Sequence, residues 1–187
     1  MNVERRRLRR AADEGFVARV WRAELVPDDH LHGFVLATNR DWTLLLLVTD
    51  SMLDGYSLVR TRDVTGVRTR GKRDLHRRWM KKHGTWPPPA PPGERLVLGS
   101  TRSLLGQVGS RHNLVGVLME DMDPDLALIG KVACLGKKSV RLQEIDNTAH
   151  WDRTTSKVRY EDVTRIDFAD HYTRVLADLG GIPPSFA

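Results

Sequence analysis

The sequence predicts a mainly β protein with flanking helices (α+β), built as two tandem small barrels that are related by an internal repeat. The first observation is the pattern V-R-x-x-D-V-T-x-[VI], which occurs at 59–67 and again at 158–166. The second is that shorter motifs recur in the same order upstream of both copies. The third is a series of short strand-like segments separated by tight turns, which is typical of small barrels.

The repeat extends well beyond this pattern. Segment 16–20 aligns with 113–117, and a Pro-Asp turn followed by glycine at 27–33 recurs at 124–130, each pair 97 residues apart. The two copies of the longer pattern lie 99 residues apart, so we expect a two-residue insertion near 146–153 in the second copy. A shared order of motifs over this length indicates that one folding unit was duplicated.

These boundaries divide the chain into three predicted parts. Residues 1–84 form a first barrel unit with an N-terminal helix and a basic C-terminal helix, and residues 95–187 form a second barrel unit with a C-terminal helix. The segment between them, 85–94, contains five prolines. Prolines disfavour helices and sheet ladders and favour an extended chain, so this segment is the predicted linker.

The first unit begins with a predicted helix at 4–13, which Gly15 ends. A basic helix is predicted near the end of the unit, over roughly 72–83, and we expect Trp79 on its apolar face to anchor it in the core. Between the two helices, turn residues separate five predicted strands at Phe16–Val26, Leu31–Thr38, Trp42–Thr49, Tyr56–Thr61 and Thr65–Thr69.

The second unit is expected to follow the same order. Ser100 is the predicted cap of a helix at 101–108, and an amphipathic helix over about 169–179 follows the last strand. Cys134 is expected to be a small buried residue within its strand. The predicted strands are Leu114–Glu120, Leu126–Leu135, Ser139–Glu144, Lys157–Tyr160 and Thr164–Phe168.

The repeated pattern is interpreted as the corner between the last two strands of each unit. Asp63 and Asp162 are expected to accept backbone N–H groups of a short helical turn, as the N-cap of a helix does. The valines that follow them, Val64 and Val163, are expected to point into the core, as is the valine or isoleucine three positions further on.

A leading helix, five short strands and a helical turn before the fifth strand resemble the Sm-like small barrel, within the wider SH3-like group. The x-x-D-V-T-x-[VI] corner is similar to the second Sm motif. This resemblance implies RNA binding and ring assembly through the outer strands. The corner departs from that of RNA-binding members, because Arg62-Asp63 and Glu161-Asp162 replace a basic Arg-Gly or Lys-His element. Fusion of two units favours an intramolecular pair over a six- or seven-membered ring.

The net charge of +6 is concentrated in two segments. Residues 1–10 carry +4 and residues 68–83 carry +7, which leaves the remainder at −5. Such segments suit nucleic acid, an acidic protein or anionic lipid, or they form solvated helix faces. Our first hypothesis is a non-enzymatic module that binds RNA or DNA through segments 5–10 and 68–82. Its predicted contacts are Arg5, Arg6, Arg7, Arg9, Arg10, Arg70, Lys72, Arg73, Arg77, Arg78, Lys81 and Lys82.

Two other hypotheses stay open. The second is a protein-interaction or regulatory scaffold that docks through strand edges or the proline-rich segment. The third, ranked lowest, is an enzyme that uses the 146–152 loop, where His150, Trp151 and Asp152 are weak small-ligand candidates. His30 and His32 share a strand face, but a polar hairpin turn is the favoured interpretation, so neither a metal nor a cofactor is expected.

Further features restrict the protein class. The longest apolar run, 44–48, is far shorter than the roughly 20 residues that span a bilayer, so no membrane partner is expected. The N-terminal segment lacks the apolar core of a secretory signal, and a single cysteine cannot form an internal disulfide. A cytoplasmic location is therefore expected. Both a protein partner and a homo-oligomer remain open.

Overall fold

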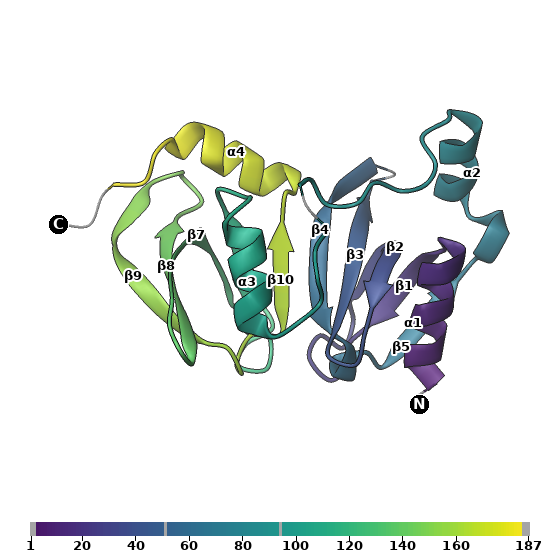
Figure 1. The fold of residues 1–187 in the computed structure, drawn as a ribbon, viewed down its shortest axis with the longest axis horizontal. Helices are drawn as coiled ribbons and strands as arrows, with labels where there is room; N and C mark the ends of the chain where they lie inside the picture. Colours follow the sequence, from purple (N-terminus) through teal and green to yellow (C-terminus); the bar gives the residue numbers. More distant parts are fainter. Residues whose placement is uncertain (1–2, 51, 94, 185–187) are drawn as a thin grey trace. The chain divides into compact units, whose positions relative to one another are not determined.

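The computed structural model describes residues 3–50, 52–93 and 95–184, and the chain divides into two compact units, Met1–Leu98 and Gly99–Ala187. Strands dominate both units, and helices flank them (Figure 1). The mainly β, α+β fold class is therefore confirmed. Ser51, in a predicted turn, and Glu94, in the predicted linker, lie outside the described residues.

The first unit contains an antiparallel sheet with the strand order β5-β1-β2-β3-β4. Helix α1 contacts β2 and β5 at one end of this sheet (Figure 1). The elements run in the order α1 (Val3–Glu14), β1 (Val17–Trp21), β2 (His30–Thr38), β3 (Trp42–Thr49), β4 (Met52–Arg60), the 3-10 turn η1 (Thr61–Asp63), β5 (Gly66–Thr69), the 3-10 turn η2 (Gly71–Arg73) and α2 (Leu75–Lys82).

The second unit contains an antiparallel sheet with the order β10-β6-β7-β8-β9. Numbered from the first strand of each unit, both orders read five, one, two, three, four. The elements are α3 (Thr101–Gly109), β6 (Val115–Leu118), β7 (Ala127–Leu135), β8 (Ser139–Ile145), β9 (Trp151–Arg159), β10 (Arg165–Phe168) and α4 (His171–Gly180).

The repeat extends to irregularities within the two sheets. The register between the second and third strands shifts at Val35/Ala37 in the first unit and at Val132/Cys134 in the second, 97 residues further on. A second shift, between the third and fourth strands, recurs in the same way. The expected insertion lies in the β8–β9 hairpin, where β8 ends at Ile145 and β9 begins at Trp151, whereas β3 ends at Thr49 and β4 begins at Met52.

Closure into barrels is not confirmed. Within each unit, no strand pairing among the described residues joins the fourth strand to the fifth, so both sheets are open. The pairing of β5 with β1 and of β10 with β6 leaves the fourth and fifth strands at opposite edges of their sheet. The structure therefore supports two β-rich units of one topology, while their assignment to a barrel family is a finer inference.

One glycine in each unit fixes how closely two strands approach. A Cβ atom at Gly33 would collide with the backbone carbonyl of Leu46 on the neighbouring strand. At the equivalent position, a Cβ atom at Gly130 would collide with the carbonyl of Gln143. These glycines recur because the backbone of the neighbouring strand occupies the space that a side chain would need.

The corner between the last two strands differs from the prediction in one respect. A 3-10 turn is present in the first unit, and Val64 and Val163 are both buried as expected. Asp63 does not cap the turn, because the turn begins at Thr61 and Asp63 is its last residue. Its carboxylate instead accepts a hydrogen bond from Arg62 Nε at 3.2 Å. In the second unit, the Asp162 N–H donates within the turn itself.

The threonine of the repeated pattern makes the same connection in both units. Its N–H donates to the carbonyl of the last residue in the first strand, at 2.9 Å in each unit. Its side chain then accepts from a second N–H, since Ala23 N lies 2.9 Å from Thr65 Oγ1 and Glu120 N lies 3.1 Å from Thr164 Oγ1. Thr164 Oγ1 also donates to Glu120 Oε2 at 2.8 Å.

The described part of the predicted linker is held against the first unit. The Trp86 ring lies 6.2 Å from the Phe34 ring, and Tyr56 Oη donates to the carbonyl of Ala90 at 2.9 Å. Leu96 is buried, and the division between the units falls after Leu98. The proline-rich segment therefore contributes to the packing of the first unit.

Two predictions of burial are wrong. Trp79 is 57% exposed. The helix that carries it begins only after Asp74, and the ring that packs beside Phe34 is that of Trp86. Cys134 is also exposed. The register shift beside Cys134 breaks the alternation of inward and outward side chains on which that prediction depended.

Candidate functional site

The first unit contains a cleft of about 780 Å³ between α1 on one side and β5 with the segment that follows it on the other. Ala11, Phe16 and Val67 contribute apolar surface to it, and Glu14 is the acidic residue in its lining. Five cationic side chains line the same cleft: Arg7, Arg10, Arg68, Arg70 and Lys72. A concave surface with this lining concentrates positive potential and attracts anions.

The first wall of the cleft follows from helical periodicity in α1. Leu8 and Ala11 are buried against the sheet, which places Arg7 and Arg10 beside this apolar stripe rather than within it. Arg7 Nη1 also lies 2.7 Å from Glu4 Oε1, one helical turn earlier. Packing of a thin apolar face thus fixes a row of arginines at the edge of the sheet.

The second wall follows from the chain path after β5. Gly71 has a positive φ of 56°, a conformation that favours glycine, and it starts the 3-10 turn that carries Lys72. Asp74 then starts α2, because its Oδ1 accepts hydrogen bonds from the N–H groups of His76 and Arg77 at 2.9 and 3.2 Å. Turn and cap together hold the basic segment next to α1.

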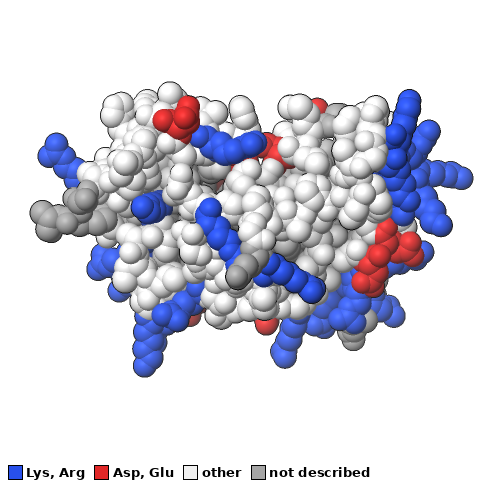
Figure 2. All heavy atoms as spheres, turned by 45° about the horizontal axis from the view of Figure 1, so that its top comes forward, with Lys and Arg blue, Asp and Glu red and all other residues white. Residues whose placement is uncertain are grey.

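The structure brings part of the predicted nucleic-acid surface together. Arg7 and Arg10 share the cleft with Arg70 and Lys72, and Arg68 joins them although it was not among the predicted contacts. Lys and Arg side chains gather at the right of Figure 2, the side on which Figure 1 draws α1 and α2. The other predicted cations outside the cleft lie on α1, η2 or α2: Arg5, Arg6, Arg9, Arg73, Arg78, Lys81 and Lys82.

Arg77 occupies a different environment from the other predicted contacts. It is buried, and its guanidinium carbon lies 4.9 Å from the Phe16 ring and 5.0 Å from the Trp86 ring. Lys81 Nζ lies 5.2 Å from the same Trp86 ring. Cation–π contacts therefore join α2 to the proline-rich segment, and Arg77 presents little surface to a ligand.

A smaller cleft of about 370 Å³ shares part of this wall. Arg68, Thr69 and Arg70 line both clefts, while Arg19 lines only the smaller one. The remaining polar lining of the smaller cleft consists of His32, Asp74 and His76.

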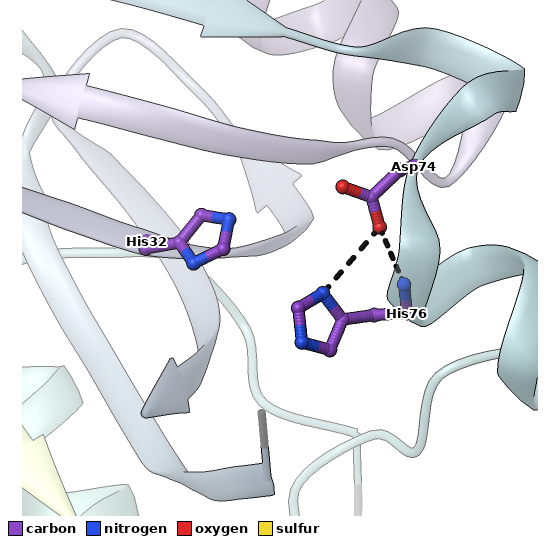
Figure 3. A group of neighbouring side chains, drawn as sticks. All are labelled: His32, Asp74 and His76. Carbon is purple, nitrogen blue, oxygen red and sulfur yellow. Dashed lines mark hydrogen bonds and ion pairs between the residues drawn. The ribbon is translucent and has the colours of Figure 1, made fainter. Parts of the chain in front are cut away.

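These last three residues form a compact cluster (Figure 3), called the His32–Asp74–His76 cluster below. Asp74 is only 4% exposed, and its Oδ1 lies 3.6 Å from His76 Nδ1. The His32 and His76 rings lie 5.7 Å apart and nearly perpendicular. Burial lowers the pKa of His32, and the neighbouring His76 and Arg19 add to that effect while Asp74 opposes it.

The sequence pattern pairs His32 with His30, two residues away on one strand. The structure instead stacks His30 on Trp21, with ring centroids 5.2 Å apart, and sets His32 beside Asp74 and His76. The signal for this cluster is the Asp-x-His sequence at 74–76, at the start of a helix. This pattern identifies Asp74 and His76, but no local pattern predicts that His32 on β2 lies beside them.

The predicted ligand loop of the second unit is organised by its own hydrogen bonds. Asp146 Oδ1 accepts from the N–H groups of Thr148 and His150 at 2.8 and 2.9 Å, and from the Thr148 hydroxyl at 2.7 Å. The backbone bond from His150 is the main cause of the lowered pKa of Asp146. Trp151 Nε1 donates to Gly180 O at 2.9 Å, so its indole fixes α4 to the sheet. Asp152 is exposed.

Comparisons of this chain with protein-family models, with curated proteins and with solved structures find no match. In the described ranges, no helix is both long and apolar enough to cross a bilayer. Fold and site together define a mainly β protein of two topologically equivalent units, of which the first carries a basic cleft.

Proposed function

We propose that the protein is a non-enzymatic binding module that holds nucleic acid, RNA or DNA, in the basic cleft of its first unit. One observation carries this proposal: two basic segments that are about 60 residues apart in sequence line a single cleft, with Arg7 and Arg10 from one and Arg68, Arg70 and Lys72 from the other. Solvated helix faces would have no reason to converge in this way.

Phosphate contacts would dominate such binding and make it depend on salt. If each of the five cations in the cleft neutralises one phosphate, log Kobs should fall with log salt at a slope of about −3.5 for a single strand and about −4.5 for a duplex. The exposed cations on α1 and α2 would extend the same surface, whereas Arg77 would contribute through packing.

Comparison of the two units supports a specialised role for the first. At the offset of 99, Arg68 and Arg70 correspond to Asp167 and Ala169 in the second unit. Asp167 forms an ion pair there, with Oδ2 at 2.6 Å from Arg165 Nη2. Because the shared topology does not require these arginines, their presence in one copy is better explained by a ligand than by the fold.

At the level of family, we infer that the units are Sm-like or SH3-like small barrels in open form. The strand order five, one, two, three, four supports this assignment, as does the 3-10 turn between β4 and β5. Sm-like barrels have RNA as an expected ligand, although a fold alone does not establish a function.

The test replaces two cleft arginines with the residues found at the equivalent positions of the second unit. We expect Arg68→Asp combined with Arg70→Ala to retain the fold and to weaken binding of a labelled single-stranded RNA or DNA by at least tenfold. Fluorescence anisotropy at about 50 and about 200 mM salt should also show a slope reduced by about 1.4 for a single strand, since two phosphate contacts are lost.

The matched control is Arg153→Asp combined with Lys131→Ala, which makes the same change of net charge on exposed strands of the second unit. It should leave the affinity nearly unchanged. Equal losses in the two double variants would mean that net charge, and not the cleft, attracts the nucleic acid. Absence of binding by the unaltered protein at low salt would refute the proposal outright.

The alternative function is a protein-interaction scaffold, and the edge strand β9 favours it. Within the described part of the second unit, β9 pairs only with β8, so its other edge is available for an added strand. Four charged residues on β9 (Asp152, Arg153, Lys157 and Arg159) oppose indiscriminate pairing. This function predicts a stoichiometric protein complex that forms without nucleic acid and is lost when proline is placed in β9.

A further inference from the structure

The His32–Asp74–His76 cluster has a composition and placement that the proposed nucleic-acid function does not require. Its donor atoms all lie within 4.8 Å of one another, although His32 comes from β2 and the other two residues from the start of α2. We propose that this cluster is a binding site for a divalent transition-metal ion of the Zn²⁺ type, formed by two imidazole nitrogens and one carboxylate oxygen.

The donor set suits this class of ion. Imidazole and carboxylate ligands are those that Zn²⁺ and its first-row neighbours accept, and three protein ligands leave one coordination position open. Two donors that each lie about 2.1 Å from a tetrahedral ion are about 3.4 Å apart. The 3.6 Å between His76 Nδ1 and Asp74 Oδ1 is already close to that separation. Because no separation in the cluster exceeds 4.8 Å, none would have to contract by more than about 1.4 Å, which rotation of side chains can supply.

His76 provides the strongest individual evidence. Both of its ring nitrogens are shielded from solvent and have no hydrogen-bond partner among the described residues. A buried polar atom without a partner destabilises the folded state, so native structures rarely leave one without a reason. Its separation from Asp74 Oδ1 exceeds a hydrogen bond, and a metal ion between these groups would satisfy the imidazole.

Asp74 is held in an orientation that leaves coordinating capacity. Oδ1 accepts the two N–H groups at the start of α2, but an ionised carboxylate has about four lone-pair sites, and Oδ2 is available as well. These capping bonds act on the carboxylate as outer hydrogen bonds act on metal ligands, because they fix its direction. His32 is suited to coordination too, since burial lowers its pKa and favours the neutral imidazole.

Charges around the cluster define what else the ion would bind. Arg19, Arg68 and Arg70 line the same cleft and repel a bare dication. An anion at the open coordination position would relieve that repulsion and contact the arginines as well. The site therefore suits a metal ion together with an anionic fourth ligand, and the arginines disfavour an ion bound without one.

The experiment uses the full chain without a histidine tag, stripped of metal with a chelator and titrated with Zn²⁺ by isothermal calorimetry. Cobalt is the second probe, because tetrahedral Co²⁺ absorbs visible light much more strongly than the octahedral aqueous ion. We expect one ion per chain. His32→Gln and His76→Gln should each weaken Zn²⁺ binding by more than about tenfold, because each removes one of three ligands.

Two further variants separate coordination from folding. His83→Gln replaces an exposed histidine at the C-terminal end of α2, outside the cluster, and this variant should bind Zn²⁺ as the unaltered protein does. Asp74→Asn retains an oxygen that can cap α2 but loses the charged ligand, so its circular dichroism should be unchanged while its metal affinity falls. The proposal fails if the unaltered chain binds no stoichiometric Zn²⁺ or Co²⁺, or if binding survives in both histidine variants. Nucleic-acid binding by the metal-free chain would leave the proposed function standing in either case.

Discussion

Replacement of Thr164 by valine tests the structural role assigned to the repeated pattern. Thr164 is completely buried, and its hydroxyl connects the corner before β10 to Glu120. Valine preserves the shape and the β-branched side chain while removing the hydroxyl. The substitution therefore changes hydrogen bonding in the core of the second unit with little change in packing volume.

The expected loss follows from the two hydrogen bonds that Thr164 makes with Glu120. Glu120 N–H loses its acceptor at 3.1 Å, and Glu120 Oε2 loses its donor at 2.8 Å, at a residue that is only 4% exposed. A typical hydrogen bond contributes about 0.5–1.5 kcal/mol and one to a carboxylate about 1.5–3 kcal/mol, so we expect a loss of about 2–4 kcal/mol in the free energy of unfolding. In a unit of this size, that lowers the melting temperature by more than about 10 °C.

Thr65→Val is the matched control, because Thr65 makes the equivalent bond to Ala23 N at 2.9 Å but lies at an exposed position. Water can replace its hydroxyl, so its loss should be below about 1 kcal/mol. Urea denaturation followed by circular dichroism gives the free energies, and hydrogen exchange shows which unit is affected. Equal losses in the two variants, or a loss below about 1 kcal/mol for Thr164→Val, would contradict this account of the corner.

Three further predictions concern stability and pH. Gly130→Ala should lower the free energy of unfolding by at least about 2 kcal/mol, because its Cβ would collide with the carbonyl of Gln143. Gly116→Ala is the control, because its Cβ would have only ordinary contacts, and it should cost less than about 1 kcal/mol. Urea denaturation measures both values. Arg77→Ala should cost about 1–2 kcal/mol through lost contacts with two aromatic rings, yet leave nucleic-acid affinity nearly unchanged in fluorescence anisotropy. The pKa of Asp146 is lowered in the folded chain, so its contribution to stability is present above its ordinary pKa and is lost as the pH falls through the lowered value. As the pH is lowered from neutral to about pH 2, the melting temperature should therefore fall less for Asp146→Ala than for the unaltered protein.

The parts of the fold that sequence predicts well are those set by local pattern. Alternating apolar residues and turn signals give the order of strands, and the repeat shows that the second unit follows the first. The burial of Val64 and Val163 was predictable, because an apolar residue that recurs at the same place in both units indicates a core position. The loop insertion was also predictable, since the repeat offset rises from 97 to 99 and an insertion near 146–153 accounts for the two extra residues.

The parts that failed depend on contacts between distant segments. Trp79 and Trp86 both follow the basic segment, and helical periodicity alone favours Trp79 as the buried residue. The structure buries Arg77 between Phe16 and Trp86 instead, because the proline-rich segment returns to the first unit. Nothing local in a run of prolines predicts where that run will pack.

The candidate site residues show the same difference between local patterns and contacts between distant segments. The cations were identifiable from composition, since each basic segment is dense enough to be noticed without a structure. Their convergence on one cleft depends on α1 packing beside β5, which is a tertiary contact. The His32–Asp74–His76 cluster was out of reach, because it joins a strand residue to a helix start more than 40 residues later.

An internal repeat offers a control that most single-domain proteins lack. Where both units keep a residue, as with Gly33 and Gly130, a structural reason is found in the same neighbouring carbonyl. Where they differ, the fold has been shown to accept either residue. Arg68 and His32 correspond to Asp167 and Ile129, at offsets of 99 and 97. Arg68 of the cleft and His32 of the cluster thus stand at positions where the shared fold accepts different residues. At such positions, selection for binding can change the residue without destabilising the fold.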